Sequence, residues 1–336
     1  MSVRRSRVLA ALAMALMIGG CGADERSAPA PAPGPSRAER SEADLARARA
    51  QVAKLQDAKT RIEASQPSKI AEPQAGGPAG SAEIDGLAGS DGGVFSDRDR
   101  RSFAALATRL AGREGIAVSA VGLDQDVSAL GELRSGVAWS TSKAPVAMAA
   151  IVGGAAKETD LRQAIAASDN AAAERLWSAL GAGRQAAAAA TAQLRAAGDG
   201  ETTVEPQRLR AGYTAFGQTD WSLRSQVRFA AGMQCSDAGQ RVLALMGDVV
   251  PAQRWGLGAT DLPAQMKGGW GPGVSPGAAD GWLDRQMGVV TIKDRPLAVA
   301  LITDAPDHGT GTANLSALAR WTTAHIRATQ IAEPAC

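Results

Sequence analysis

Ser140 and Lys143 place a serine hydroxyl and a lysine amine three positions apart, in the run Ser-Thr-Ser-Lys. A serine hydroxyl is a poor nucleophile at neutral pH and needs a neighbouring base to take its proton. Positions three apart share one face of a helix, so Lys143 can present its amine to Ser140. Pro145 is tolerated only in a first helical turn, where the helix dipole favours developing negative charge and lowers the pKa of a nearby lysine. The pattern predicts a serine nucleophile with a lysine base, although the same spacing also fits a capping serine beside a surface lysine.

A second polar group, Ser168-Asp169-Asn170, follows 28 positions after Ser140. Its structural interpretation is an N-cap cluster that opens a helix over 171–180. Its catalytic interpretation makes Ser168 a proton relay between Lys143 and the leaving group. Asn170 would then orient Lys143 and the substrate amide, while Asp169 holds the loop.

The third group is Lys267-Gly268-Gly269-Trp270, which precedes the last predicted strands. A lysine followed by two glycines suits the edge of a strand where a substrate backbone must approach closely. A simple glycine turn is the alternative.

Taken in order, the three groups resemble S-x-x-K, S-D-N and K-[TS]-G, the signature set of serine β-lactamases and penicillin-binding DD-peptidases. The resemblance covers roughly residues 95–330 and is closest to class A β-lactamase-like lipoproteins of actinobacteria. It implies that Lys143 is the base, that the backbone N–H groups of Ser140 and Trp270 form an oxyanion hole, and that Lys267 supplies a positive field. The implied substrate is a β-lactam or a D-Ala-D-Ala-like peptidoglycan peptide, with no cofactor and no metal.

The chain departs from the family pattern at several positions. Gly268 stands where the family carries a hydroxyl residue that helps to bind the substrate carboxylate. Gly268 and Gly269 are still expected to line the substrate, and Arg285 is a candidate for the lost carboxylate contact. Glu205-Pro206 resembles the Glu-Pro of the family's Ω-loop, whose glutamate activates the deacylating water, but Leu209 replaces the Asn that normally follows. Glu205 fits a solvated loop residue equally well, and Arg285 also fits a structural role.

These departures keep a second function open. The chain is either a serine hydrolase acylated at Ser140 or a catalytically weak or inactive cell-envelope lipoprotein that binds peptides or a partner protein through the same cleft. Labelling of Ser140 by a fluorescent penicillin or a fluorophosphonate would distinguish the two.

The elements that must position these groups alternate in type along the chain. The pattern predicts helices at 103–110, over 140–194 with breaks at 153–154 and 181–183, at 222–246 and at 313–328. It predicts strands at 116–123, near 131–133, at 286–291 and at 297–303. This order is typical of an α/β (α+β) fold of the β-lactamase/DD-peptidase type: an antiparallel sheet flanked by terminal helices, plus a reduced all-α lobe. The predicted domain is 94–336, and the tryptophans and both histidines within it are expected in structural or surface positions.

The first residues predict export. A basic stretch precedes an apolar run over 8–18, and small residues lead directly to Cys21. We expect a lipoprotein signal peptide over 1–20 and a lipid on Cys21, which would anchor the protein to the cell membrane outside the cytoplasm. An ordinary signal peptide with a chance cysteine is the alternative. A tether over 21–40, a helical stalk over 41–64 and a linker over 65–93 follow.

The bulk composition limits the remaining function classes. The formal net charge of +2 offers no basis for nucleic-acid binding, and two histidines and three cysteines are too few and too scattered for a metal site rich in these residues. With Cys21 assigned to lipid, Cys235 and Cys336 remain, and export predicts a disulfide between them. The sequence leaves the oligomeric state open.

Overall fold

An antiparallel sheet with strand order β2-β1-β7-β6-β5 lies at the centre of the fold. The structure is a computed structural model that describes residues 94–277 and 281–336, so the segments predicted over 1–93 lie outside the described residues. The five strands are β1 Arg113–Ala120, β2 Val127–Gly131, β5 Ala264–Pro272, β6 Trp282–Ile292 and β7 Arg295–Ala305. The strand carrying Lys267 is therefore an edge strand of this sheet.

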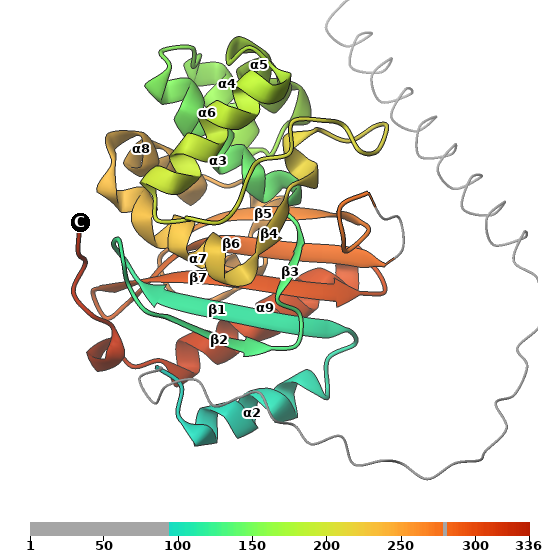
Figure 1. Cartoon of the computed structure of the whole chain (residues 1–336). Coiled ribbons are helices and arrows are strands. Elements are labelled where there is room, and N and C mark those ends of the chain that lie inside the picture. The colour runs from blue at the N-terminus through green and yellow to red at the C-terminus, as the bar shows by residue number, and fades with distance from the viewer. Residues whose placement is uncertain (1–93, 278–280) are drawn as a thin grey trace, which may run out of the picture. The chain divides into compact units, whose positions relative to one another are not determined.

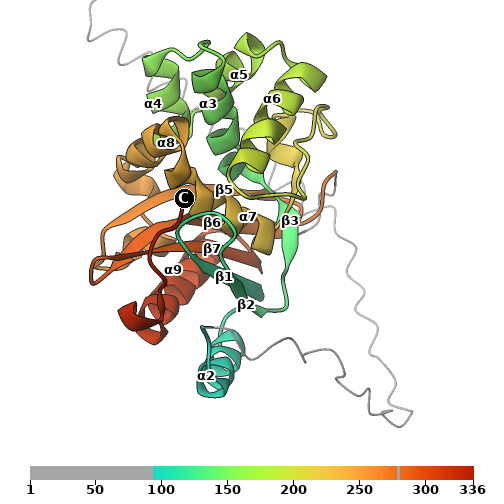
Figure 2. The same ribbon diagram turned by 60° about the vertical axis from the view of Figure 1, so that its left-hand side comes forward.

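Helices cover one face of the sheet as a separate lobe (Figures 1 and 2). The central helix of this lobe, α3, is apolar along nearly its whole length, and its residues 143–150 are buried. An α-helix that is apolar on all sides must be surrounded by other elements. The described helices on this side are α3 Lys143–Val152, α4 Glu158–Ala166, α5 Asn170–Ala179, α6 Gly183–Ala196, α7 Leu223–Gly232 and α8 Asp237–Gly247.

The breaks between these helices follow local chemistry. The predicted interruptions at 153–154 and 181–183 are confirmed, because Gly153 caps α3, and Gly181 and Ala182 separate α5 from α6, which begins at Gly183. A further break falls at 167–169, where the Asp169 carboxylate accepts a hydrogen bond of 2.6 Å from the Ala172 N–H and caps α5. The predicted N-cap cluster is therefore present.

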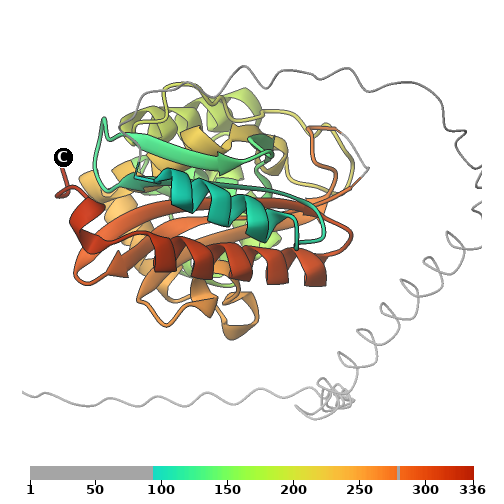
Figure 3. The same cartoon turned by 90° about the horizontal axis from the view of Figure 1, so that it is seen from below.

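The opposite face of the sheet carries the two terminal helices, α2 Asp97–Ala107 and α9 His308–His325 (Figure 3). Trp321 of α9 packs against Phe95 and Phe103, with ring centroids 5.7 and 5.3 Å apart. The sheet is therefore buried on both faces, with one apolar core beneath the helical lobe and another beneath α2 and α9. The predicted fold class, an antiparallel sheet with terminal helices and an all-α lobe, is confirmed.

Short elements complete the described chain. The strands β3 Ser135–Val137 and β4 Asp220–Ser222 pair with each other in a small second sheet. The short 3-10 helices are η1 Trp139–Ser142, η2 Phe216–Gln218, η3 Met233–Cys235, η4 Pro251–Gln253, η5 Gly256–Ala259 and η6 Ala328–Gln330. None of the helices among the described residues has the length and apolar character needed to cross a membrane.

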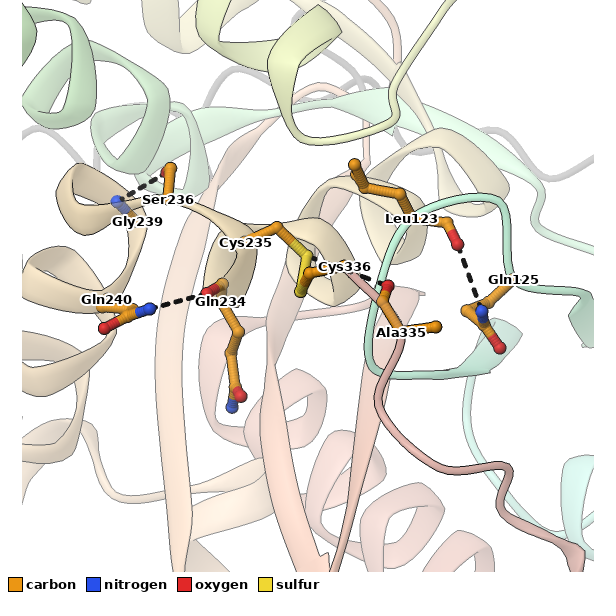
Figure 4. Close-up of a disulfide and its surroundings, with 9 residues drawn as sticks. All are labelled: Leu123, Gln125, Gln234, Cys235, Ser236, Gly239, Gln240, Ala335 and Cys336. Atoms are coloured by element: carbon orange, nitrogen blue, oxygen red, sulfur yellow. Dashed lines mark hydrogen bonds between the residues drawn. A yellow bond between two sulfur atoms is a disulfide. The ribbon is translucent and has the colours of Figure 1, made fainter.

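A disulfide joins Cys235 to Cys336, with their Cα atoms 5.3 Å apart (Figure 4). The C-terminal tail also forms a parallel bridge between Ala335 and Gly122, and the Leu123 N–H donates to the Ala335 carbonyl at 2.8 Å. The predicted cysteine pairing is confirmed. It ties the end of the chain to the junction between α7 and α8 and to the turn after β1.

Candidate active site

Ser140 lies in the 3-10 turn η1, directly before the first residue of α3, Lys143. The preceding residue, Trp139, has a φ of 46°, a conformation that costs free energy for a bulky side chain and needs support from its surroundings. That support is visible: the Trp139 indole packs against Tyr213 and over Gly271, where an added Cβ would lie 2.9 Å from the ring. The turn therefore presents Ser140 at the start of a buried helix, as the sequence predicts.

Two lysine amines meet at the hydroxyl of Ser168. Lys143 Nζ donates to the Ser168 carbonyl and lies 3.3 Å from Ser168 Oγ, while Lys267 Nζ donates to the same Oγ at 2.7 Å. Lys267 Nζ also donates to the Gly268 carbonyl at 3.0 Å. Ser168 itself has a φ of 58°. The fold thus brings together three residues from the three sequence motifs, which are up to 124 positions apart (143 to 267).

Burial alters the protonation of both amines. Lys143 is 1% exposed, and the loss of solvent lowers its pKa to about 7, against an opposing effect of the Asp169 carboxylate. Burial also holds the pKa of Lys267 well below its ordinary value, and the nearby Lys143 lowers it further. A lysine can accept a proton only when it is neutral, so the site gives Lys143 the protonation state required of a base near neutral pH.

The edge strand β5 runs against the nucleophile turn. A Cβ built on Gly269 would lie 2.8 Å from the Ser140 nitrogen and 2.9 Å from the Thr141 nitrogen, so only glycine allows this approach. Trp270 follows Gly269 on this strand. This arrangement agrees with an oxyanion hole formed by the Ser140 and Trp270 N–H groups, which stays a prediction.

Arg285 has the structural role that the sequence left open, rather than a position from which it could reach a substrate carboxylate. It is fully buried, and its guanidinium donates to Gln226 Oε1 at 2.9 Å and to the carbonyls of Gly136 and Trp221 at 2.7 and 3.0 Å. Gln226 in turn donates to Thr141 Oγ1 at 2.9 Å, in the nucleophile turn. Arg285 is therefore an internal brace between the sheet, α7 and η1, and its protein partners occupy the donors that a carboxylate would need.

Asn170 and Glu205 make no hydrogen bond to Ser140 or Lys143 in this structure, and their catalytic roles stay predictions. Asn170 is exposed at the first turn of α5 and makes no hydrogen bond to Lys143, whose amine binds Ser168 instead. The Glu205 carboxylate is turned onto its own loop, where Oε1 accepts from the Gln207 N–H at 2.8 Å. No hydrogen bond joins it to Ser140 or Lys143, both of which are described.

The indole of Trp255 fills the space that a side chain at position 268 would occupy. A Cβ built on Gly268 would lie 2.4 Å from the six-membered ring of Trp255. Gln286 holds the segment after Trp255 in place, since it donates to the Trp255 carbonyl at 2.8 Å and accepts from the Leu257 N–H at 2.7 Å. Glycine at 268 is thus required by the indole above it.

No family model and no curated protein sequence matches the chain. Solved structures do match it. A β-lactamase from Chitinophaga pinensis superposes with a TM-score of 0.53 at 16% identity, covering 68% of this chain and 99% of that one. A β-lactamase from Sphaerobacter thermophilus superposes with a TM-score of 0.52 at 14% identity, covering 68% of this chain and 96% of that one. A variant of the class A β-lactamase of the last common ancestor of Gram-negative bacteria superposes with a TM-score of 0.51 at 18% identity. The match covers 67% of this chain and 97% of that one.

The chain has the serine β-lactamase fold.

Within this serine β-lactamase fold, sequence reasoning missed a buried acid paired with a histidine. His308 Nδ1 lies 2.6 Å from Asp284 Oδ1, and the Asp284 side chain is fully buried while that of His308 is 40% exposed. Burial raises the pKa of Asp284 to about 6, and the neighbouring His308 opposes this rise. The partial exposure of His308 agrees with its predicted surface position, but its pairing with a buried acid was not predicted. No spacing could reveal the pair, because the two residues come from β6 and α9.

The described part of this β-lactamase fold contains no group of three or more His, Cys, Asp and Glu side chains that could hold a metal ion. The described site brings together two serines, two lysines and backbone N–H groups.

Proposed function

We propose that the protein is a serine hydrolase that forms an acyl-enzyme at Ser140. The observation that carries the proposal is the meeting of the Lys143 and Lys267 amines at Ser168 Oγ, beside the turn that holds Ser140. The lowered pKa of Lys143, about 7, supports its use as a base at neutral pH.

In the reaction we propose, a proton passes from Ser140 to Lys143, and Ser168 relays a proton from Lys143 to the leaving group. Neutral Lys143 takes the proton of the Ser140 hydroxyl as its oxygen bonds to the substrate carbonyl carbon. The Ser140 and Trp270 N–H groups stabilise the resulting oxyanion. Ser168 then passes a proton from Lys143 to the leaving group as the bond between that group and the carbonyl carbon breaks. Hydrolysis of the acyl-enzyme by water would complete the cycle.

The sequence resemblance implies β-lactams or D-Ala-D-Ala-like peptides as substrates, and we carry these classes forward as candidates. We also propose that the protein is displayed outside the cell membrane through a lipid on Cys21. The Cys235–Cys336 disulfide supports an oxidising compartment.

A fluorophosphonate probe tests the nucleophile without depending on the substrate class, since it phosphonylates activated serines with loss of fluoride. We expect one label per chain, located at Ser140 by peptide mass spectrometry and abolished in Ser140→Ala. A fluorescent penicillin then tests the β-lactam class separately. A chain that takes up no fluorophosphonate under conditions where a known serine hydrolase is fully labelled would contradict the proposal.

The second candidate is a binding protein that uses the same cleft without chemistry. Two observations favour it: the indole of Trp255 above Gly268, and the Glu205 carboxylate turned onto its own loop. Binding of a peptide with no label at Ser140 would support this candidate.

A further inference from the structure

Four rings gather beside the third motif, and we call them the aromatic cluster: Trp255, Trp270, Trp282 and His308. The imidazole of His308 stacks on Trp270 with centroids 5.1 Å apart and an angle of 26°. Trp255 stands edge-on to both, at 6.0 Å from Trp270 and 6.1 Å from His308, and Trp282 lies 6.2 Å from His308. All four side chains are partly exposed. Large rings that keep part of their surface in water are common where proteins bind ligands.

The aromatic cluster adjoins the candidate oxyanion hole through Trp270. Successive side chains of a strand point to opposite faces of the sheet. Gly268 and Trp270 therefore lie on the face that carries the cluster, while Gly269 faces the Ser140 turn. Because β5 is an edge strand, an extended substrate lying along it would place its groups on both faces. A carbonyl held at Ser140 would then leave the adjoining substituent within reach of the rings.

The cluster is chemically unsuited to a carboxylate. An anion is recognised by cations or by several hydrogen-bond donors. Here Trp255 occupies the space above Gly268, Arg285 donates to protein acceptors, and Lys267 Nζ already donates to Ser168 Oγ and to the Gly268 carbonyl. The imidazole of His308 is already paired with the buried Asp284 carboxylate, so it is not a free cation for a substrate anion.

We infer that the aromatic cluster is a subsite beside Ser140 that binds an uncharged ring of the substrate. It lies on the leaving-group side, because Ser168, the proposed proton donor to the leaving group, binds Lys267 next to Gly268. The inference rests on the proposed acylation of Ser140 and narrows its substrate class. It predicts that substrates with an uncharged aromatic leaving group react faster than substrates that carry a carboxylate next to the scissile bond, such as D-Ala-D-Ala peptides.

Three thioesters of N-phenylacetylglycine test the subsite: the benzyl, ethyl and carboxymethyl thioesters share one acyl group and differ only in the leaving thiol. The rate of thiol release per enzyme, divided by the rate of alkaline hydrolysis of each ester, removes differences in intrinsic reactivity. We expect the benzyl ester to exceed the ethyl ester by about 10-fold, the size of one aromatic contact. The carboxymethyl ester should be the slowest.

Variants assign the preference to the rings. Trp255→Ala should lower the benzyl-to-ethyl ratio towards 1, and Trp255→Phe should keep most of it. Trp177→Phe, in the core of the helical lobe, is the matched control and should leave the ratio unchanged. Fluorophosphonate labelling of each variant shows that the nucleophile is intact.

The outcomes separate the two proposals. If Ser140 takes up fluorophosphonate but the benzyl and ethyl esters react equally, or the carboxymethyl ester reacts fastest, the subsite is wrong and the acylation stands. If no probe acylates Ser140, both are wrong.

Discussion

The rate of Ser140 acylation should follow the protonation of Lys143. With a pKa of about 7, about 9% of Lys143 is neutral at pH 6 and about 91% at pH 8. A lysine at its ordinary pKa of 10.5 would be only about 0.03% neutral at pH 7. Because the base must be neutral, the labelling rate should rise about 10-fold between pH 6 and pH 8 and then level off.

The sign of this dependence follows from the cause of the shift. Burial disfavours the charged form of Lys143, so its proton is lost at a lower pH, and activity falls as the pH drops through about 7. The assay is the second-order rate of fluorophosphonate labelling from pH 5.5 to 9, corrected for hydrolysis of the probe. A profile that is flat over this range, or that rises only towards pH 10, would refute the role of Lys143.

Asp169→Asn offers a matched perturbation of the same pKa. The Asp169 charge raises the pKa of Lys143, so its removal should move the rise in rate to lower pH. Asn retains the side-chain oxygen that accepts from the Ala172 N–H, so the cap of α5 should survive. An unchanged profile in a variant with normal thermal stability would show that Asp169 does not act on this base.

Three further predictions concern turnover, stability and location. Acyl-enzyme should form in a burst and hydrolyse slowly in stopped-flow traces. Glu205→Gln should leave the rate of the slow phase unchanged, since Oε1 can still accept from the Gln207 N–H. A slower phase in this variant would show that Glu205 is the base that activates water. Replacing Cys235 and Cys336 by Ser should lower the free energy of unfolding by up to about 4.7 kcal/mol, the chain-entropy value for a loop of about 100 residues, as measured by urea titration; an unchanged midpoint would contradict this. Cys21→Ala should move the protein from the membrane fraction to the soluble fraction, and an unaltered distribution would argue against lipidation.

Much of the fold could be predicted because its signals are local. The apolar run after Lys143 and the glycines at 153–154 and 181–183 indicate the helices of the lobe and where they break. The predicted continuous helix over 222–246 is instead divided at 233–236, where the Ser236 side chain caps α8. The boundaries are less well predicted than the elements, since a cap depends on hydrogen bonds that side chains form only in the folded chain.

The roles of Asn170, Glu205 and Arg285 could not be predicted in the same way. Each was inferred from its position along a family pattern, but each depends on which atoms surround the side chain. Arg285 shows this most clearly, because the carbonyls that hold it come from Gly136 and Trp221, far away in the sequence.

The sequence by itself determined which chemistry the chain can offer. Residue types and spacing indicate the nucleophile and its partners, in the order Ser140, Lys143, Ser168 and Lys267. They also indicate the pairing of Cys235 with Cys336. Both depend on the chemical properties of the side chains, which the sequence states directly. The tertiary structure alone decided the environment of those side chains. The burial that lowers the pKa of Lys143, the indole that fills the space above Gly268 and the pairing of Asp284 with His308 each require residues from separate elements to pack together. Packing between distant segments leaves no periodic signal in the chain, and so these features emerge only in the folded protein.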